Sequence, residues 1–189
     1  MTKNIVYLAI ATTLAITVCC RNRAQDTETH ISHNDTIHAD TFLQRDTLVK
    51  RLTLAGELEI SGDNPGEVHA YFDTAAFRFH GPDGFEAGYA GLNGYFSSLR
   101  HAFDDRTIQR GIIVQEGNYL ACQTTISGKF VRPFTQSPAG TIPPNGQQVV
   151  FNLMNIFRFD ERGRITEEWV QIDNRSLLRQ LTASNRRDR

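Results

Sequence analysis

The residues best suited to chemistry are polar side chains that share one face of a predicted pair of strands, over residues 149–173. They are Asn155, Glu167, Gln171 and Asp173. A carboxyl group can take up and return a proton, and an amide can orient a substrate oxygen. The set therefore suits cofactor-free acid–base work on a carbon acid, or the binding of a small ligand without chemistry.

The two strands are predicted to meet at a tight turn over residues 160–163, where Gly163 suits a positive φ. We expect Asp160 to pair with Arg164, and the rest of the register follows by counting outward along both strands. The predicted pairs are Phe159 with Ile165, Phe157 with Glu167, Asn155 with Trp169, Leu153 with Gln171, and Phe151 with Asp173. Because side chains alternate along a strand, all of these share one face.

That face is mostly large and apolar, and an apolar surface with a few convergent polar groups is typical of a small-molecule pocket. The alternative is that the polar residues lie at strand ends, in water. The opposite face carries Val150, Met154, Ile156, Val170 and Ile172 among polar residues. It is predicted to be a second packing surface or the interface of a homodimer.

The composition is that of one soluble globular domain, because the chain has 189 residues, of which 40% are hydrophobic and 22% charged. The net charge of −1 gives no field that would attract nucleic acid or an anionic membrane. Beyond residue 20 the sequence contains a single cysteine, Cys122, so an intramolecular disulfide is not expected.

The N-terminal residues differ from the rest of the chain. Residues 5–20 carry no charge and follow Lys3, which predicts a signal peptide or lipoprotein leader over residues 1–20. Cys19 and Cys20 close this run and are the candidates for lipidation, although Val18 stands where a small residue is usual. We therefore expect export to the periplasm, either free or anchored to the membrane by the lipid alone.

Residues 21–41 are polar and lack an apolar period, which predicts a flexible tether. A tether gives its histidines, His30, His33 and His38, no fixed geometry, so we expect no metal site there. A globular domain is predicted over residues 42–183, and a short polar tail over residues 184–189.

The spacing of apolar residues predicts the elements of the domain. Helices are expected after Asp46, over residues 67–72 and 89–103, and from Asn174 or Ser176 onward. Strands are expected over residues 75–80, 107–116 and 119–131, before the pair already described. Helices first and long strands last favour an α+β fold with one antiparallel sheet.

Two further segments are expected to lie near the pocket. The helix over residues 89–103 has an apolar stripe that is predicted to pack in the core, with its edge at the pocket. The stripe consists of Leu92, Phe96, Leu99 and Phe103, with Tyr95 beside it. Residues 133–146 form a loop rich in Pro, Gly, Ser and Thr, which is long enough to cover a pocket mouth.

Motifs for several common chemistries are missing from the sequence. There is no Gly-rich phosphate loop, no His-Glu-x-x-His, no Cys-x-x-Cys and no Gly-x-Ser-x-Gly. Dinucleotide binding, zinc hydrolysis and serine-hydrolase chemistry therefore lack support, and no cofactor is expected.

A family pattern is visible in the last third of the chain, at residues 157–160 (FRFD), 163–165 (GRI), 168–169 (EW), Asp173 and residues 177–181 (LLRQL). Weaker matches lie at residues 77–80 (FRFH), Gly88, 99–105, 116–117, 124–129 and 142–149. Over residues 47–182 the pattern resembles the SnoaL-like polyketide cyclases, or ester cyclases, of the nuclear-transport-factor-2-like superfamily.

The resemblance implies a cone-shaped fold, in which a strongly bent antiparallel sheet wraps around N-terminal helices and encloses an apolar pocket. It implies that Asp173, at the position of the family's acid–base aspartate, is catalytic in an intramolecular aldol closure. A pocket histidine is also used, and His80 is the candidate; the alternative is a surface histidine at a strand end. The chain departs from the family at residues 128–130 (GKF), where Gly-Thr-His is common, and at Asn155, where an acid or histidine is frequent.

Two functions follow as hypotheses. The first is an exported enzyme of cyclase or isomerase type that acts on a small apolar carbonyl compound, with Asp173 moving the proton. In this hypothesis Asn155 and Gln171 orient the substrate oxygens, and the apolar part is held by Trp169, Phe151, Phe96 and Tyr95. The second is an exported, non-catalytic module of the same fold that binds a hydrophobic ligand or serves as an accessory domain.

Overall fold

The computed structural model describes residues 34–184, with side chains from residue 45 onward. Its α-helices are α1 (Asn34–Ser61), α2 (Val68–Tyr71), α3 (Tyr89–Ala102) and α4 (Asn174–Leu181), with short 3-10 helices at Pro65–Glu67 and Pro82–Gly84. Its strands are β1 (Arg78–His80), β2 (Glu86–Ala87), β3 (Phe103–Glu116), β4 (Tyr119–Phe130), β5 (Phe134–Ser137), β6 (Gly140–Ile142), β7 (Gln148–Phe159) and β8 (Ile165–Ile172). The predicted α+β class is confirmed.

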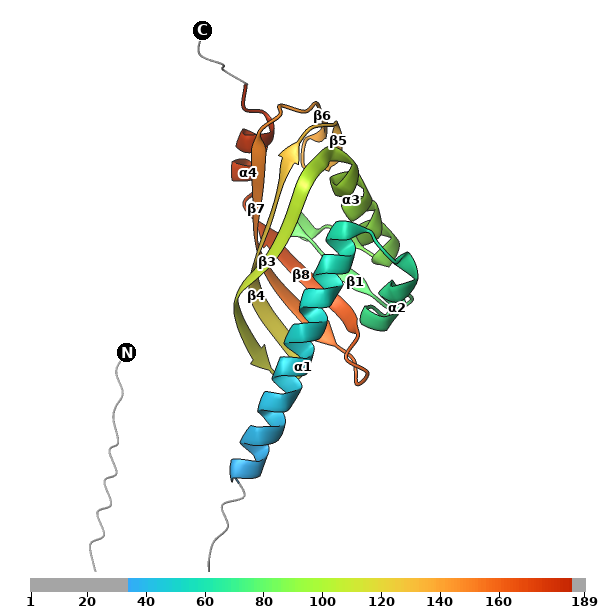
Figure 1. Cartoon of the computed structure of the whole chain (residues 1–189), viewed down its shortest axis with the longest axis vertical. Coiled ribbons are helices and arrows are strands. Elements are labelled where there is room, and N and C mark those ends of the chain that lie inside the picture. Colours follow the sequence, from blue (N-terminus) through green and yellow to red (C-terminus); the bar gives the residue numbers. More distant parts are fainter. Residues whose placement is uncertain (1–33, 185–189) are drawn as a thin grey trace, which may run out of the picture. The chain divides into compact units, whose positions relative to one another are not determined.

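The main sheet has six strands in the order β2-β1-β8-β7-β4-β3 (Figure 1). Neighbouring strands are antiparallel, except that β1 runs parallel to β8. The segment predicted to be a loop over residues 133–146 instead contains a small separate sheet of β5 and β6. Tight hairpins join β3 to β4 and β7 to β8, whereas the segment that contains β5 and β6 connects β4 to its neighbour β7.

Helix α1 packs against the sheet through a stripe of buried residues, Leu48, Leu52 and Ala55, which recur at helical spacing. It ends at Ser61, and Gly62 follows with a φ of 73°, the left-handed conformation that commonly terminates a helix. It begins earlier than predicted, at Asn34, so the last part of the proposed tether over residues 21–41 is helical. No proline interrupts the sequence between Asn34 and the stripe, so a helix docked by that stripe can extend toward its N-terminus.

The turn between β7 and β8 has the predicted pairing, because the Asp160 amide donates to the Arg164 carbonyl at 2.8 Å and Gly163 has a φ of 70°. Phe159 pairs with Ile165, also as predicted. The register then shifts by one residue, and Arg158 pairs with Glu167. This β-bulge turns the side chains of β8 that follow it to the opposite faces from those predicted.

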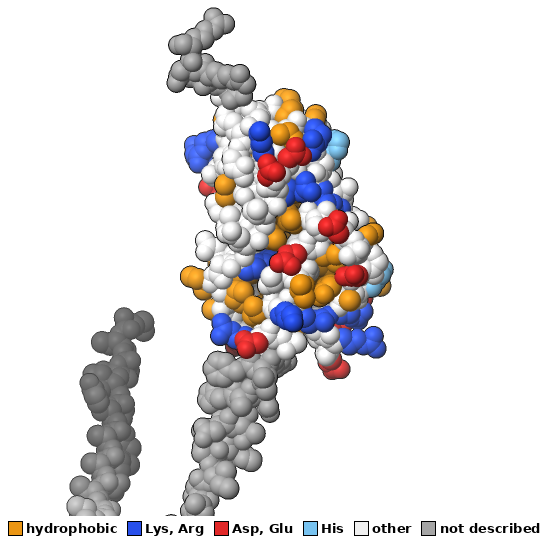
Figure 2. Space-filling model, in the orientation of Figure 1, with side chains coloured by type: hydrophobic (Ala, Val, Ile, Leu, Met, Phe, Trp, Pro, Cys, Tyr) orange, Lys and Arg blue, Asp and Glu red, His pale blue; other side chains and the backbone are white. Residues whose placement is uncertain are grey.

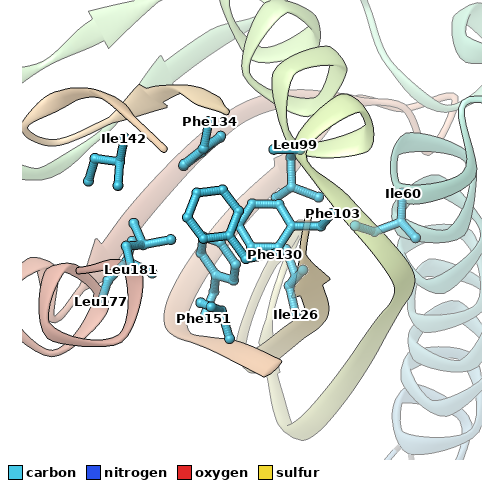
Figure 3. Close-up of a cluster of buried hydrophobic side chains, with 12 residues drawn as sticks. Ile60, Leu99, Phe103, Ile126, Phe130, Phe134, Ile142, Phe151, Leu177 and Leu181 are labelled. Atoms are coloured by element: carbon cyan, nitrogen blue, oxygen red, sulfur yellow. The ribbon is translucent and has the colours of Figure 1, made fainter. Parts of the chain in front are cut away.

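The core lies between the helices and one face of the sheet and forms two clusters. Figure 3 shows the first, in which the rings of Phe103 and Phe130 stack at 5.0 Å and Phe151 meets Phe103 edge-on at 5.4 Å. The second joins the α1 stripe to Leu92 of α3 and to sheet residues Leu120, Cys122, Phe157, Phe159 and Ile165. Helices α1 and α3 therefore cover the same face of the sheet.

The molecular surface mixes charges of both signs with apolar side chains on the face drawn in Figure 2. Several large apolar residues are exposed on the face of the sheet away from the core, among them Ile112 at 77%, Met154 at 58% and Ile156 at 45%. Within residues 34–184, no helix is both long enough and apolar enough to cross a membrane.

Candidate active site

A cavity of about 420 Å³ lies between the core face of the sheet and the helices. This size is typical of small-molecule pockets. Most of its wall is apolar, with contributions from Leu92, Phe96, Leu153, Phe157, Val170 and Ile172. Polar side chains reach the wall from several helices and strands, among them Glu59 of α1, Arg110 of β3, Thr124 of β4, Asn155 of β7 and Glu168 of β8.

Glu168 and Asn155 form the polar centre of this cavity. The Asn155 amide nitrogen donates to a Glu168 carboxyl oxygen at 2.7 Å. Both residues are buried: Asn155 is 4% exposed and Glu168 is 8% exposed. The carbonyl oxygen of the Asn155 side chain is buried without a hydrogen-bond partner. A buried acceptor without a partner is costly, so the Asn155 oxygen is available to a ligand that can donate a hydrogen bond.

The pKa of Glu168 is raised to about 7, mainly because burial disfavours its charged form. The Arg110 charge and the Asn155 hydrogen bond lower it in part, and the carboxyl of Glu59 raises it further. A carboxyl group that titrates near neutral pH can act as a base and then as an acid within one reaction cycle.

A second carboxyl group reaches the cavity from α1. Glu59 is buried, and its Oε1 accepts a hydrogen bond from the Tyr89 hydroxyl at 2.5 Å. Burial raises the pKa of Glu59, while the Tyr89 hydrogen bond and the Arg100 charge lower it in part. Burial and the Glu59 contact also raise the pKa of Tyr89. Since the Glu59–Tyr89 pair is internally satisfied, Glu168 is the more available carboxyl.

Arg110 brings a positive charge to the same cavity. Its Nη1 donates to the Thr124 hydroxyl at 2.6 Å, and its guanidinium carbon lies 5.2 Å from the centre of the Phe157 ring. Gly56 of α1 leaves room for it, because a Cβ there would lie 2.9 Å from the Arg110 Nη2. Strand, ring and helix therefore hold the guanidinium at one position in the wall.

Several residues predicted to line the pocket do so. Phe151 and Asn155 of β7 and Tyr95 and Phe96 of α3 all contribute to the wall. Burial raises the pKa of the Tyr95 hydroxyl, so it remains a neutral polar group. The loop predicted as a cover also contributes, through Gln136, Ser137 and Pro138.

The predicted face of β8 is wrong beyond Ile165, because the bulge reverses it. Trp169 lies on the outer face, half-buried, and its ring stacks on His80 at 5.1 Å with an interplanar angle of 8°. Glu167 lies on that outer face as well, within 2.8 Å of the His80 Nε2 and 3.0 Å of the Arg158 Nη2. The candidate histidine is thus part of an outer ion-pair cluster, not of the cavity wall.

Asp173 and Gln171 are also placed differently from the prediction. Both are exposed, and neither lines the cavity. Asp173 is the N-cap of α4, where its carboxylate accepts the Ser176 amide at 2.9 Å. Such a cap satisfies an amide that the helix leaves without a partner, which is a structural role.

Glu168 was missed by the sequence interpretation, although a signal for it exists. It shares strand parity with Val170 and Ile172, and these apolar residues both face the cavity. Cys19, Cys20 and the leader over residues 1–20 lie outside the described residues, so export and lipidation stay predictions. Among the described side chains, no group of three His, Cys, Asp or Glu is placed to hold a metal ion.

Comparison with known proteins places this geometry in a family context. The model of the SnoaL-like polyketide cyclase family matches residues 57–181. A search of curated proteins found no match.

Solved structures share the fold. A protein from Jannaschia sp. CCS1 assigned to the SnoaL-like polyketide cyclases superposes with a TM-score of 0.60 at 19% identity, over 75% of this chain and 93% of that chain. Wild-type IdmH from Streptomyces antibioticus gives 0.57 at 24% identity, over 73% and 98%. An NTF2-like protein from Burkholderia pseudomallei K96243 gives 0.52 at 15% identity, over 72% and 98%. The predicted nuclear-transport-factor-2-like fold is confirmed.

Proposed function

The chain belongs to the SnoaL-like polyketide cyclase family, and from this premise we propose that it carries out cofactor-free acid–base chemistry on a small apolar carbonyl compound, with Glu168 exchanging the proton. The observation that supports this proposal is the placement of Glu168. It is a buried carboxyl group in an apolar cavity, its pKa is raised to about 7, and its partner is an amide rather than a cation.

The proposed first step moves a proton from carbon to Glu168. The ionised carboxylate takes a proton from the carbon next to the substrate carbonyl, and the electrons of that C–H bond pass to the carbonyl oxygen as an enolate. Glu168 is then a neutral acid, which its buried position favours. The Asn155 amide holds the carboxyl in place throughout, since it donates to one of its oxygens.

The second step returns the proton and leaves the enzyme unchanged. In an aldol-type cyclisation, the enolate carbon forms a bond to a second carbonyl carbon of the same molecule, and the resulting alkoxide takes the proton from Glu168. In an isomerisation, Glu168 returns the proton to a different carbon. Both routes need the substrate to be held in a folded or planar pose, which the apolar walls of Phe96, Phe151 and Leu153 can provide.

Deuterium exchange into a simple cyclic ketone tests the proposal without knowledge of the natural substrate. The probe is 2-tetralone in D2O at neutral pH, followed by the loss of its α-proton NMR signals. We expect the wild-type protein to accelerate exchange and Glu168→Gln to lower the acceleration by about 100-fold or more, because general-base catalysis contributes that much. Glu167→Gln, a neighbour on the outer face, is the matched control and should retain the rate.

The outcome also separates catalysis from binding. One possible result is that 2-tetralone binds with the same affinity to the wild type and to Glu168→Gln, while its protons exchange only at the buffer rate. This result would contradict catalysis and favour a module that binds hydrophobic ligands. Equal exchange rates in wild type and Glu168→Gln would show that another group moves the proton.

A further inference from the structure

In the part of the chain that the structure describes, Arg110 has no carboxylate partner and no hydrogen bond to a backbone carbonyl, unlike Arg45, Arg51, Arg100 and Arg106, which each donate to a carbonyl. Among the described side chains, Arg132, Arg158 and Arg164 each form an ion pair with an Asp or Glu, at Asp104, Glu167 and Asp160 respectively. No such pair within 4.0 Å is formed by Arg110 in this part of the chain. Its Nε is buried and has no hydrogen-bond partner. A buried guanidinium nitrogen in this state has lost its water without replacement, which is costly.

Arg110 lies in the cavity wall, so a ligand in the cavity could offset the cost of its desolvated guanidinium. It is the one basic residue among those that line the cavity within residues 45–184, and the remainder of the wall is apolar, amide, hydroxyl or carboxyl. Its side chain is held by Thr124, by the Phe157 ring and by the close approach of Gly56. The cation is therefore positioned in advance at a surface where water is largely replaced by apolar side chains.

We propose that Arg110 receives an anionic oxygen of the ligand, so that the cavity takes a flat apolar carbonyl compound that carries one carboxylate group. This inference rests on the proposed function and specifies its substrate class. A guanidinium offers a fork of N–H donors that matches a carboxylate, and such charge-assisted bonds are stronger in a site of low dielectric. Arg110 on β3 and Glu168 on β8 reach the cavity from different strands, so one end of the ligand is anchored while a carbon elsewhere in it meets the base.

A matched pair of probes isolates the charge. 2-Naphthoate and 2-naphthamide have the same ring system and nearly the same shape, and only the first is an anion. Their dissociation constants are measured by isothermal titration calorimetry with the full-length chain at about pH 6, below the raised pKa of Glu168, so that its carboxyl repels the anion less. We expect the wild-type protein to bind naphthoate at least tenfold more tightly than naphthamide.

The variants decide whether Arg110 is the cause. Arg110→Gln should bring the two affinities to within about threefold, mainly by weakening naphthoate binding, and Arg110→Lys should restore part of the preference. Arg158→Gln removes the same charge from the outer face, where Arg158 pairs with Glu167, and should keep the full preference. A purely structural role for Arg110 would change both affinities together.

Two results would overturn the inference: equal affinities for the two probes in the wild type, or a preference that survives in Arg110→Gln. Failure of the proposed function is a separate result, because it is measured by 2-tetralone exchange. A charge preference that depends on Arg110 without any exchange would leave the anion site standing and remove the catalytic role of Glu168.

Discussion

Glu167 and Glu168 are adjacent in β8, and both are buried, at 7% and 8% exposure. Their surroundings are opposite. Glu167 lies on the outer face, where its carboxyl contacts the His80 Nε2 at 2.8 Å and forms an ion pair with the Arg158 Nη2 at 3.0 Å. Glu168 lies on the cavity face with an amide partner, and its pKa is raised to about 7. Burial is common to the two carboxyl groups; they differ in that a cation pairs with Glu167 within 4.0 Å, whereas the Arg110 charge offsets the burial of Glu168 only in part.

A single β-bulge assigns these two roles. Phe159 pairs with Ile165, but Arg158 pairs with Glu167, so one extra residue of β8 is accommodated next to the turn. The Thr166 hydroxyl donates to the Arg158 carbonyl at 3.2 Å in this region. Without the bulge, Glu167 and Trp169 would face the cavity and Glu168 would face outward.

The largest expected effect is the loss of unfolding free energy when an aromatic residue of the core face is replaced, compared with one of the outer face. Phe157 faces the core and is 2% exposed, whereas Trp169 is half-buried and stacks on His80. Phe157→Ala should lower the free energy of unfolding by about 3–5 kcal/mol because it leaves a cavity in the core. Trp169→Ala should cost about 1 kcal/mol, the size of an aromatic pair contact.

Urea unfolding of the two variants measures both costs. Since the chain has one tryptophan, far-UV circular dichroism is the signal to use for Trp169→Ala. A cost for Trp169→Ala equal to that for Phe157→Ala would place Trp169 in the core, and the bulge would then be wrong.

The second effect concerns how stability depends on pH. The pKa of Glu168 is about 7 in the folded protein, above the ordinary value of 4.5, so the native state holds this proton more tightly than the unfolded state. The stability that it contributes is complete below pH 4.5 and is lost as the pH rises to about 7. Glu168→Gln should remove this loss, which is on the order of 3 kcal/mol.

Thermal or urea unfolding at pH 5 and pH 8 measures this difference between the wild type and Glu168→Gln. Glu59, Arg110 and Asn155 interact with the Glu168 carboxyl, so their coupling to its charge is part of the difference that is measured. Glu167→Gln should behave in the opposite way and be less stable than the wild type at pH 8, because it breaks contacts to His80 and Arg158. Identical pH dependence in wild type and Glu168→Gln would mean that Glu168 titrates normally.

The smallest expected effect is on stability at Asp173, and it distinguishes a helix cap from a catalytic residue. Asp173→Ala should lower stability by about 1 kcal/mol, because it removes the acceptor of the Ser176 amide at the start of α4. Asp173→Asn retains a capping oxygen and should be nearly neutral. Neither variant should change 2-tetralone exchange, and a loss of exchange in Asp173→Asn would return the catalytic assignment to Asp173.

Much of the fold could be predicted from the sequence, because it depends on patterns that extend over many residues. The apolar stripes of α1 and α3, the turn at Gly163 and the alternation along β7 all have the predicted consequences. Phe151, Asn155 and Phe157 face the cavity as expected. The site on β8 could not be predicted in the same way, because one inserted residue exchanges the faces of a strand and Thr166 gives no local sign of a bulge.

The family resemblance also had a limit in this region. It pointed to Asp173 through a position in a motif, whereas the structure uses that carboxylate as a helix cap. Val170 and Ile172 share the parity of Glu168, but Ile165 and Trp169 are apolar at the opposite parity, so alternation along β8 gave only a weak signal for the buried face. For a carboxyl group, the partners decide its chemistry, and partners become visible only in three dimensions.

The titration of Glu168 shows whether its carboxyl group can serve as the acid–base group of the cavity. The carboxyl carbons of the wild-type protein, labelled with ¹³C-glutamate, are followed by NMR from acid to alkaline pH, and the Glu168 signal is assigned by its absence in Glu168→Gln. The account predicts a midpoint near pH 7, because burial disfavours the carboxylate and no adjacent cation offsets this effect in full. A midpoint at or below the ordinary value of 4.5 would show a carboxylate that is ionised and stabilised, and would contradict its role as the acid–base group of the cavity.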